Sequence, residues 1–122
     1  MNRDNVVVTK SKQFAIRIVR FAKFIRQEGV DTILVRQILK SGTSIGANIR
    51  ESINAQSKDD FIHKLSIALK EADETAYWLE LLVGAEEISK NQFDSLCIDL
   101  REIIALLTSI IKTSKGIRNI EK

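Results

Sequence analysis

Residues 41–82 read SGTSIGANIRESINAQSKDDFIHKLSIALKEADETAYWLELL and carry the two strongest signals in this chain of 122 residues. The first is a group of small residues, Gly42, Gly46 and Ala47, where another helix can approach closely. The second is Trp78, which falls almost opposite the apolar stripe of a long helix. Together they predict a helical bundle that also packs against copies of itself.

The composition is that of one soluble helical domain covering residues 1–122. The chain has no proline, 44% hydrophobic and 29% charged residues, and no apolar run near the ~20 residues needed to cross a bilayer. We therefore expect no membrane contact and no signal peptide. A single cysteine excludes an intramolecular disulfide and is typical of a cytoplasmic protein.

Apolar residues recur with a helical period of about 3.6 and predict four antiparallel helices, an all-α up-down-up-down bundle. The first helix is expected at 11–28, after a flexible arm at 1–10, and it ends at Gly29. Asp31 or Thr32 caps the second helix, Ser57 opens the third, and Ser89 or Asn91 caps the fourth. The tail at 117–122 is expected to fray.

The second helix could either continue through Gly42 and Gly46 or break there, because each glycine costs about 1 kcal/mol relative to alanine inside a helix. The apolar phase runs unbroken from Leu34 to Ile49, which favours one continuous helix to about residue 55. The alternative is a glycine loop that binds phosphate, but SGTSIGAN lacks the lysine and the spacing of a P-loop.

Asn48 is the polar residue of interest in this helix, since it projects near the apolar stripe. We predict a buried amide that forms hydrogen bonds in the core and fixes the helix register. The alternative role for Asn48 is ligand binding.

The formal charge is only +3, but it is unevenly distributed. Residues 1–30 carry a net charge of +5 and residues 57–90 a net charge of −4. On the first helix, one arc opposite the apolar stripe holds Arg17, Arg20, Lys23 and Arg26. This arc is either a solvated face or a surface that contacts phosphates or an acidic partner.

The third helix has a second line of side chains away from its core stripe. Tryptophan is a favoured anchor of protein interfaces, and a monomer that exposes it would leave a large apolar surface in contact with water. We predict an oligomer interface made by Ile67, Lys70, Glu71, Glu74, Trp78 and Leu81. The alternative is that the N-terminal arm buries Trp78 within one chain.

No catalytic or metal-binding pattern stands out in the sequence. His63 is the only histidine and lacks the repeated carboxylate partners of a di-iron bundle, so we expect it on the helix surface. Cys97 lies on the core stripe with no base beside it in sequence. We therefore expect no enzyme activity, no metal and no cofactor.

Four segments carry a resemblance to a known family: SIGANIRES (44–52), Ser57, DFIHKLSIALKEA (60–72) and ETAYWLELL (74–82). They resemble the small bacterial four-helix-bundle proteins known as 23S rRNA intervening-sequence proteins, many of which have proline at the position of Gly46. The resemblance implies a homo-oligomer, commonly a pentamer. A related accessory protein of diversity-generating retroelements is a basic pentamer that binds nucleic acid and a reverse transcriptase.

Three functional hypotheses follow. The first is a non-catalytic homo-oligomeric scaffold that binds RNA or an RNA-associated protein through the basic arc. The second is an adaptor that binds only protein, and the third is a bundle that binds a metal or a small ligand.

Overall fold

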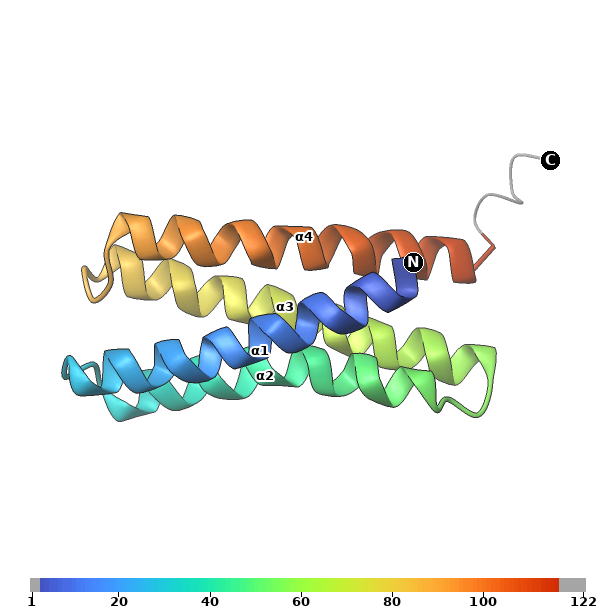
Figure 1. Cartoon of the computed structure of the whole chain (residues 1–122), viewed down its shortest axis with the longest axis horizontal. Coiled ribbons are helices and arrows are strands. Elements are labelled where there is room, and N and C mark those ends of the chain that lie inside the picture. Colours follow the sequence, from blue (N-terminus) through green and yellow to red (C-terminus); the bar gives the residue numbers. More distant parts are fainter. Residues whose placement is uncertain (1–2, 117–122) are drawn as a thin grey trace.

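The computed structural model describes residues 3–116, which form four α helices and no strand. The helices are α1 (Arg3–Gln27), α2 (Thr32–Ile53), α3 (Lys58–Gly84) and α4 (Lys90–Ser114). Each helix packs against its neighbour in sequence, and α1 closes the bundle by crossing obliquely to α4 (Figure 1). The predicted all-α four-helix bundle is confirmed.

Helix α1 begins much earlier than predicted. It starts at Arg3, and Val7 is buried in the same core stripe as Phe14 and Ile18. The predicted flexible arm at 1–10 is therefore wrong for residues 3–10. Burial of Val7 outweighs the modest helix propensity of three consecutive valines. The tail predicted to fray, 117–122, lies outside the described residues.

Helix α2 runs without a break through both glycines, as the apolar phase predicted. A Cβ atom at Gly42 would lie 2.8 Å from Cγ2 of Ile18. A Cβ atom at Gly46 would lie 3.2 Å from the carbonyl oxygen of Ser11. The two glycines thus let α1 approach α2 closely, and the groove they form is filled within one chain.

A buried hydrogen bond joins α2 to α3. Oγ1 of Thr75 lies 2.9 Å from Oγ of Ser41, and both side chains are fully buried. Further along the same antiparallel pair, Nζ of Lys64 lies 3.0 Å from a carboxylate oxygen of Glu51. The two contacts define one register for α2 and α3. The Ser41–Thr75 pair was not identified from the sequence.

Asn48 does not have the predicted role in this register. Its side chain is half-buried rather than buried, and its amide donates a 2.9 Å hydrogen bond to the carbonyl oxygen of Ser44. Ser44 is one turn earlier in the same helix, so this bond satisfies the amide without linking two helices. The prediction of a buried register residue at Asn48 is therefore corrected, because Ser41 and Thr75 supply the polar contact between the helices.

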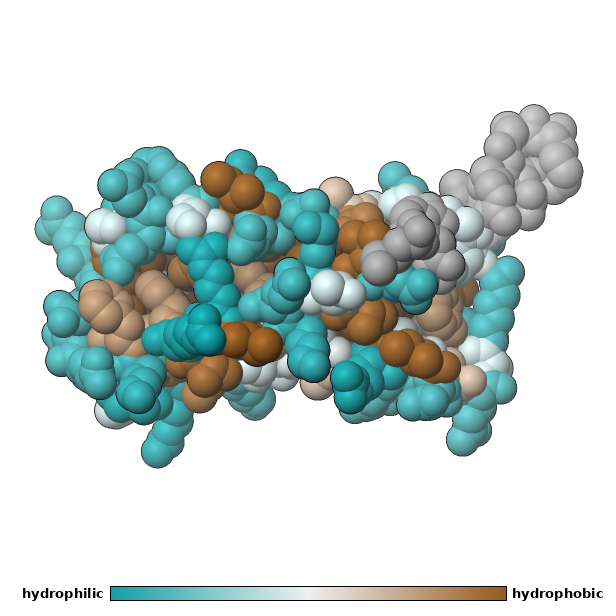
Figure 2. Space-filling model, in the orientation of Figure 1, coloured by the Kyte–Doolittle hydropathy of each residue, from teal (hydrophilic) through white to brown (hydrophobic). Residues whose placement is uncertain are grey.

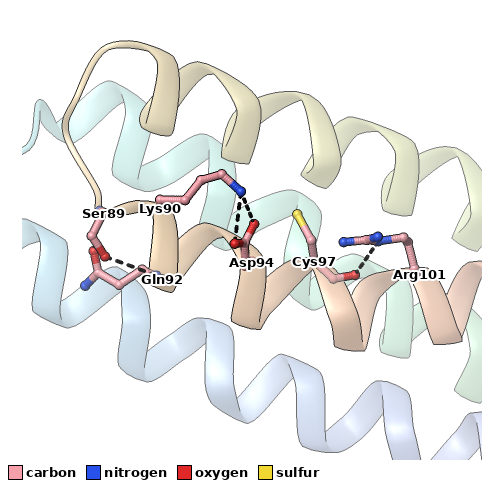
Figure 3. A network of polar contacts seen from close by, with 6 residues as sticks. All are labelled: Ser89, Lys90, Gln92, Asp94, Cys97 and Arg101. Carbon is pink, nitrogen blue, oxygen red and sulfur yellow. Dashed lines mark hydrogen bonds and ion pairs between the residues drawn. The ribbon is translucent and has the colours of Figure 1, made fainter.

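The helix ends follow the expected capping chemistry. Gly29 has a φ of +90°, which suits the left-handed residue after α1. Asp31 caps α2 and Ser57 caps α3, each accepting a hydrogen bond from a backbone N–H of the first turn. Ser89 caps α4 by accepting a hydrogen bond from the backbone N–H of Gln92. The side chain of Gln92 in turn accepts one from the backbone N–H of Ser89, which completes a capping box (Figure 3). The sequence predicted the Ser57 cap and left two candidates for each of the other caps, of which the structure has Asp31 and Ser89.

The close approach at Gly42 predicts a specific loss of stability. Gly42→Ala should lower the free energy of unfolding by about 1–3 kcal/mol, because the new methyl group overlaps the branched side chain of Ile18. Urea denaturation followed by circular dichroism measures this change.

Gly84→Ala is the matched control, since a Cβ atom at Gly84 would meet nothing within 4 Å. That variant should be neutral or more stable by up to about 1 kcal/mol, as helix propensity alone requires. Equal effects of the two substitutions would contradict the close contact.

Candidate nucleic-acid interface

Helices α1 and α2 carry positive charge and almost no negative charge. Residues 5–27 and 32–50 contain no aspartate or glutamate, and the turn between them adds only Glu28 and Asp31. We call residues 5–50 the basic hairpin. Its basic residues are Lys10, Lys12, Arg17, Arg20, Lys23, Arg26, Arg36, Lys40 and Arg50.

Packing of α1 on α2 brings these charges together from both helices. Lys12 and Arg50 line one shallow groove of about 350 Å³ on the outer side of the pair. The antiparallel register set by the contact of Gly42 with Ile18 places Lys40 level with Arg20 along the bundle. The fold therefore joins two basic segments that are separate in the sequence into one surface.

Arg17 differs from the other predicted phosphate ligands. One of its terminal nitrogens lies 2.7 Å from a carboxylate oxygen of Asp99 and 3.1 Å from the carbonyl oxygen of Ser95. The other terminal nitrogen forms a hydrogen bond with the Ser95 hydroxyl group. These bonds to α4 hold the guanidinium within the bundle. Arg17 is thus primarily a structural residue.

Apart from Lys10, which pairs with Glu102, the other cationic side chains of the basic hairpin are free to meet a partner. Within residues 3–116, seven of them are exposed and form no ion pair with the chain itself: Lys12, Arg20, Lys23, Arg26, Arg36, Lys40 and Arg50. The set contains three of the four predicted residues and four others. The absence of acidic residues from both helical segments is the sequence signal that could have identified those four.

Apolar side chains interrupt this basic surface. On α1, Ile16, Val19 and Phe24 are 44%, 51% and 45% exposed. Figure 2 shows the corresponding pattern, in which hydrophobic patches alternate with hydrophilic ones on the face where α1 runs in front. The surface therefore offers both charge and apolar area to a partner.

The opposite half of the bundle has the reverse charge. Residues 58–114 hold eleven aspartates and glutamates against six lysines and arginines. Two of these carboxylates, Asp99 and Glu102, pair with Arg17 and Lys10 across the seam between α1 and α4. A polyanion would consequently be attracted to the basic hairpin and repelled by α3 and α4.

The predicted interface residues of α3 form one continuous strip along the helix. We call it the α3 strip: Ile67, Lys70, Glu71, Glu74, Trp78 and Leu81. Lys70 and Leu81 are exposed, and the other four are half-buried. The strip borders the seam between α3 and α2, since Thr75, one turn before Trp78, is bonded to Ser41 of α2.

Trp78 is partly covered by its own chain. Its indole packs against the core, its Nε1 lies 3.3 Å from a carboxylate oxygen of Glu74, and its ring meets Tyr77 edge-on. The alternative of burial by the N-terminal arm is wrong, because α1 and α3 lie diagonally across the bundle. Tyr77 is 55% exposed and Leu81 is 38% exposed, so apolar surface remains beside Trp78.

The residues considered for metal or nucleophile chemistry lie apart from one another. His63 is exposed on α3, as predicted, and residues 3–116 contain no cluster of three or more potential metal ligands. Cys97 is half-buried on α4, and its burial raises the pKa of the thiol. The nearby Arg101 bonds to the carbonyl oxygen of Cys97 (Figure 3). No helix in the described part of the chain is long and apolar enough to cross a membrane.

One apolar cavity opens at the end of the bundle where α2 turns into α3. It measures about 410 Å³ and is lined mainly by aliphatic and aromatic side chains, with no charged residue in the lining. Asn5, Ser52 and Ser57 are its polar side chains. The cavity therefore offers no charged group to an anion or a metal ion.

Comparison with known proteins gives a consistent family and fold. The sequence model of the 23S rRNA-intervening sequence protein family matches residues 3–109. A crystal structure of a protein of unknown function, from the S23 ribosomal protein family of Bacteroides thetaiotaomicron VPI-5482, shares 57% sequence identity with a TM-score of 0.89. The similarity covers 91% of this chain and 99% of that chain. No curated protein matches this sequence.

The contacts of Arg17 predict that it contributes to stability, unlike its basic neighbours. Arg17→Gln should lower the free energy of unfolding by about 0.5–1 kcal/mol, because it breaks a partly exposed ion pair and the bonds to Ser95. Lys23→Gln should change it by less than about 0.5 kcal/mol. Chemical denaturation followed by Trp78 fluorescence tests this difference, and an equal response of the two variants would contradict it.

Proposed function

The chain belongs to the 23S rRNA-intervening sequence protein family, and on this premise we propose that it is a cytoplasmic, non-catalytic scaffold that binds RNA or an RNA-associated protein. The contact surface in this proposal is the basic hairpin. Seven exposed cations there have no carboxylate partner among the described residues, and this is the observation that carries the proposal.

The physical basis is electrostatic. Each phosphate neutralised by a lysine or arginine releases condensed counterions, which favours binding and makes the affinity fall as salt rises. Unpaired cations can exchange water for phosphate without breaking an internal ion pair. The modest total charge of +3 does not reveal this concentration of positive charge, because the acidic half of the bundle offsets the basic hairpin.

The proposed scaffold is a homo-oligomer, and the family resemblance favours a pentamer. The α3 strip is the proposed interface, since Leu81 and the neighbouring Tyr77 leave apolar surface exposed beside Trp78. Glu71 and Glu74 in the strip would pair with cations of a neighbouring subunit. Several basic hairpins in one assembly would bind a long RNA with a higher effective concentration than a single one.

A second candidate function is a protein-binding adaptor with no nucleic-acid contact. It is favoured by the exposed Ile16 and Val19, which add apolar area to the basic surface in the manner of a protein interface. An acidic partner would then occupy the basic hairpin. Complexes of this kind would survive nuclease treatment.

Removing three hairpin charges should weaken RNA binding. In the triple variant Arg20→Gln, Lys23→Gln and Arg36→Gln, the slope of log Kd against log salt should fall by about one for each phosphate that the protein no longer neutralises. The affinity should fall similarly for RNAs of different sequence. Fluorescence anisotropy with a labelled RNA over a range of salt concentrations measures both effects.

The matched control removes the same net charge from outside the basic hairpin. Lys58→Gln, Lys112→Gln and Lys115→Gln change three exposed lysines outside the basic hairpin. If this control and the hairpin variant lose the same affinity, binding is a response to total charge and the proposed surface is wrong. If the wild-type protein binds no RNA at low salt, the RNA proposal fails as a whole.

The proposed oligomer has a separate test at the exposed end of the α3 strip. Leu81→Glu should shift the mass distribution in native mass spectrometry toward monomers, because it places a charge in the apolar contact. Trp78→Ala is less informative, since Trp78 also packs against the core of its own chain. Ile98→Glu, at an exposed position on α4, is the control. An unchanged mass distribution for Leu81→Glu would exclude the strip as the interface.

A further inference from the structure

Phe24 occupies an unusual position on the basic hairpin. It is the only one of the five phenylalanines that is exposed, with 45% of its surface accessible. It is also the only aromatic residue among the exposed apolar residues of α1 and α2. On the helix surface it follows Arg20 by one turn, whereas Lys23, its neighbour in sequence, projects about 100° away around the helix. An exposed aromatic ring thus lies one helical turn from a cation, Arg20, that has no ion-pair partner in the described chain.

We infer that the basic hairpin takes single-stranded RNA, and that the ring of Phe24 is a platform on which an unpaired base stacks. This inference rests on the proposed RNA-binding function and names the class of RNA within it.

Stacking would give a role to an exposed aromatic ring that lies one turn from a cation able to contact phosphate. A base presents a flat π surface whatever its identity, so an exposed ring can accept it without sequence preference. One helical turn, about 5.4 Å, separates Arg20 from Phe24. This spacing allows the guanidinium to contact the phosphate of a nucleotide while the ring contacts its base.

Charge gives the strand a direction along the surface. Glu28 lies one turn beyond Phe24, at the end of α1, and would repel phosphates there. In the other direction, Lys23 and Arg20 are followed by Lys12 with no carboxylate on α1 between them. The strand would therefore run from Phe24 back along α1 toward Lys12.

A duplex would not use Phe24 in this way. The bases of an A-form helix are stacked on one another, and its major groove is too deep and narrow for side chains to enter. Duplex RNA could contact only the cations, through its phosphates. The ring therefore gives the hairpin a preference for single strands that charge alone would not provide.

Three substitutions separate stacking from general apolar contact. Phe24→Ala should weaken binding of a labelled single-stranded RNA by about tenfold, the usual effect of removing one stacking platform. Phe24→Leu should lose most of the same affinity, because leucine keeps the apolar bulk but has no π face. Phe24→Trp should retain the affinity. Binding of a duplex RNA of equal length should stay unchanged in all three variants.

The salt dependence and an additional variant provide controls. Because Phe24 carries no charge, the slope of log Kd against log salt should not change, in contrast to Lys23→Gln. Ile98→Ala removes an exposed apolar side chain from α4 and should affect neither RNA. Circular dichroism and Trp78 fluorescence establish that each variant is folded.

The outcomes distinguish this inference from the function on which it rests. If the wild-type protein binds neither RNA, the proposed function fails. If it binds both equally and Phe24→Ala binds single strands normally, only the stacking inference is overturned. If Phe24→Ala shifts the native mass distribution toward smaller species, the ring belongs to a contact between subunits and the inference is also overturned.

Discussion

The close contact between α1 and α2 is the constraint on which the other features depend. Gly42 and Gly46 present no side chain toward α1, so Ile18 and the backbone at Ser11 occupy the space that larger residues would fill. The helix tolerates two unfavourable glycines because the packing of α1 compensates for their low propensity. This contact also aligns two basic helices side by side. Without it, the cations of α1 and α2 would not form one surface.

That arrangement has an electrostatic cost that the rest of the bundle only partly relieves. Like charges on adjacent helices repel, and the nearest carboxylates of α4 neutralise only Lys10 and Arg17. The remaining seven cations stay exposed to solvent, where screening keeps their repulsion small. In the proposed complex, the phosphates of an RNA would neutralise this set of charges. Phe24 is likewise exposed and outside the core cluster, and the same proposed complex would cover it.

Local patterns in the sequence were sufficient for the number of helices and for most of their ends, but not for the start of α1. The phase from Leu34 to Ile49 predicted the unbroken α2, and Gly29 and Ser57 marked their helix ends correctly. Features that depend on pairing between helices were missed. The Ser41–Thr75 bond and the contact of Arg17 with Asp99 join residues far apart in the sequence, and no periodicity within one helix reveals them. Burial of Val7 was missed for the same reason, since its partners come from other helices.

The antiparallel pairing of α1 with α4 determines where the described chain leaves the bundle. Arg3 and Gly116 lie at the same end, because Lys10 pairs with Glu102 and the two helices run in opposite directions. Phe24 is near the other end, about 30 Å from Arg3 along α1, given a rise of 1.5 Å per residue. A label or tether attached at Arg3 or Gly116 would therefore be at the end of the bundle opposite Phe24. Immobilisation through either residue would leave the ring and the neighbouring Arg20 at the distal end.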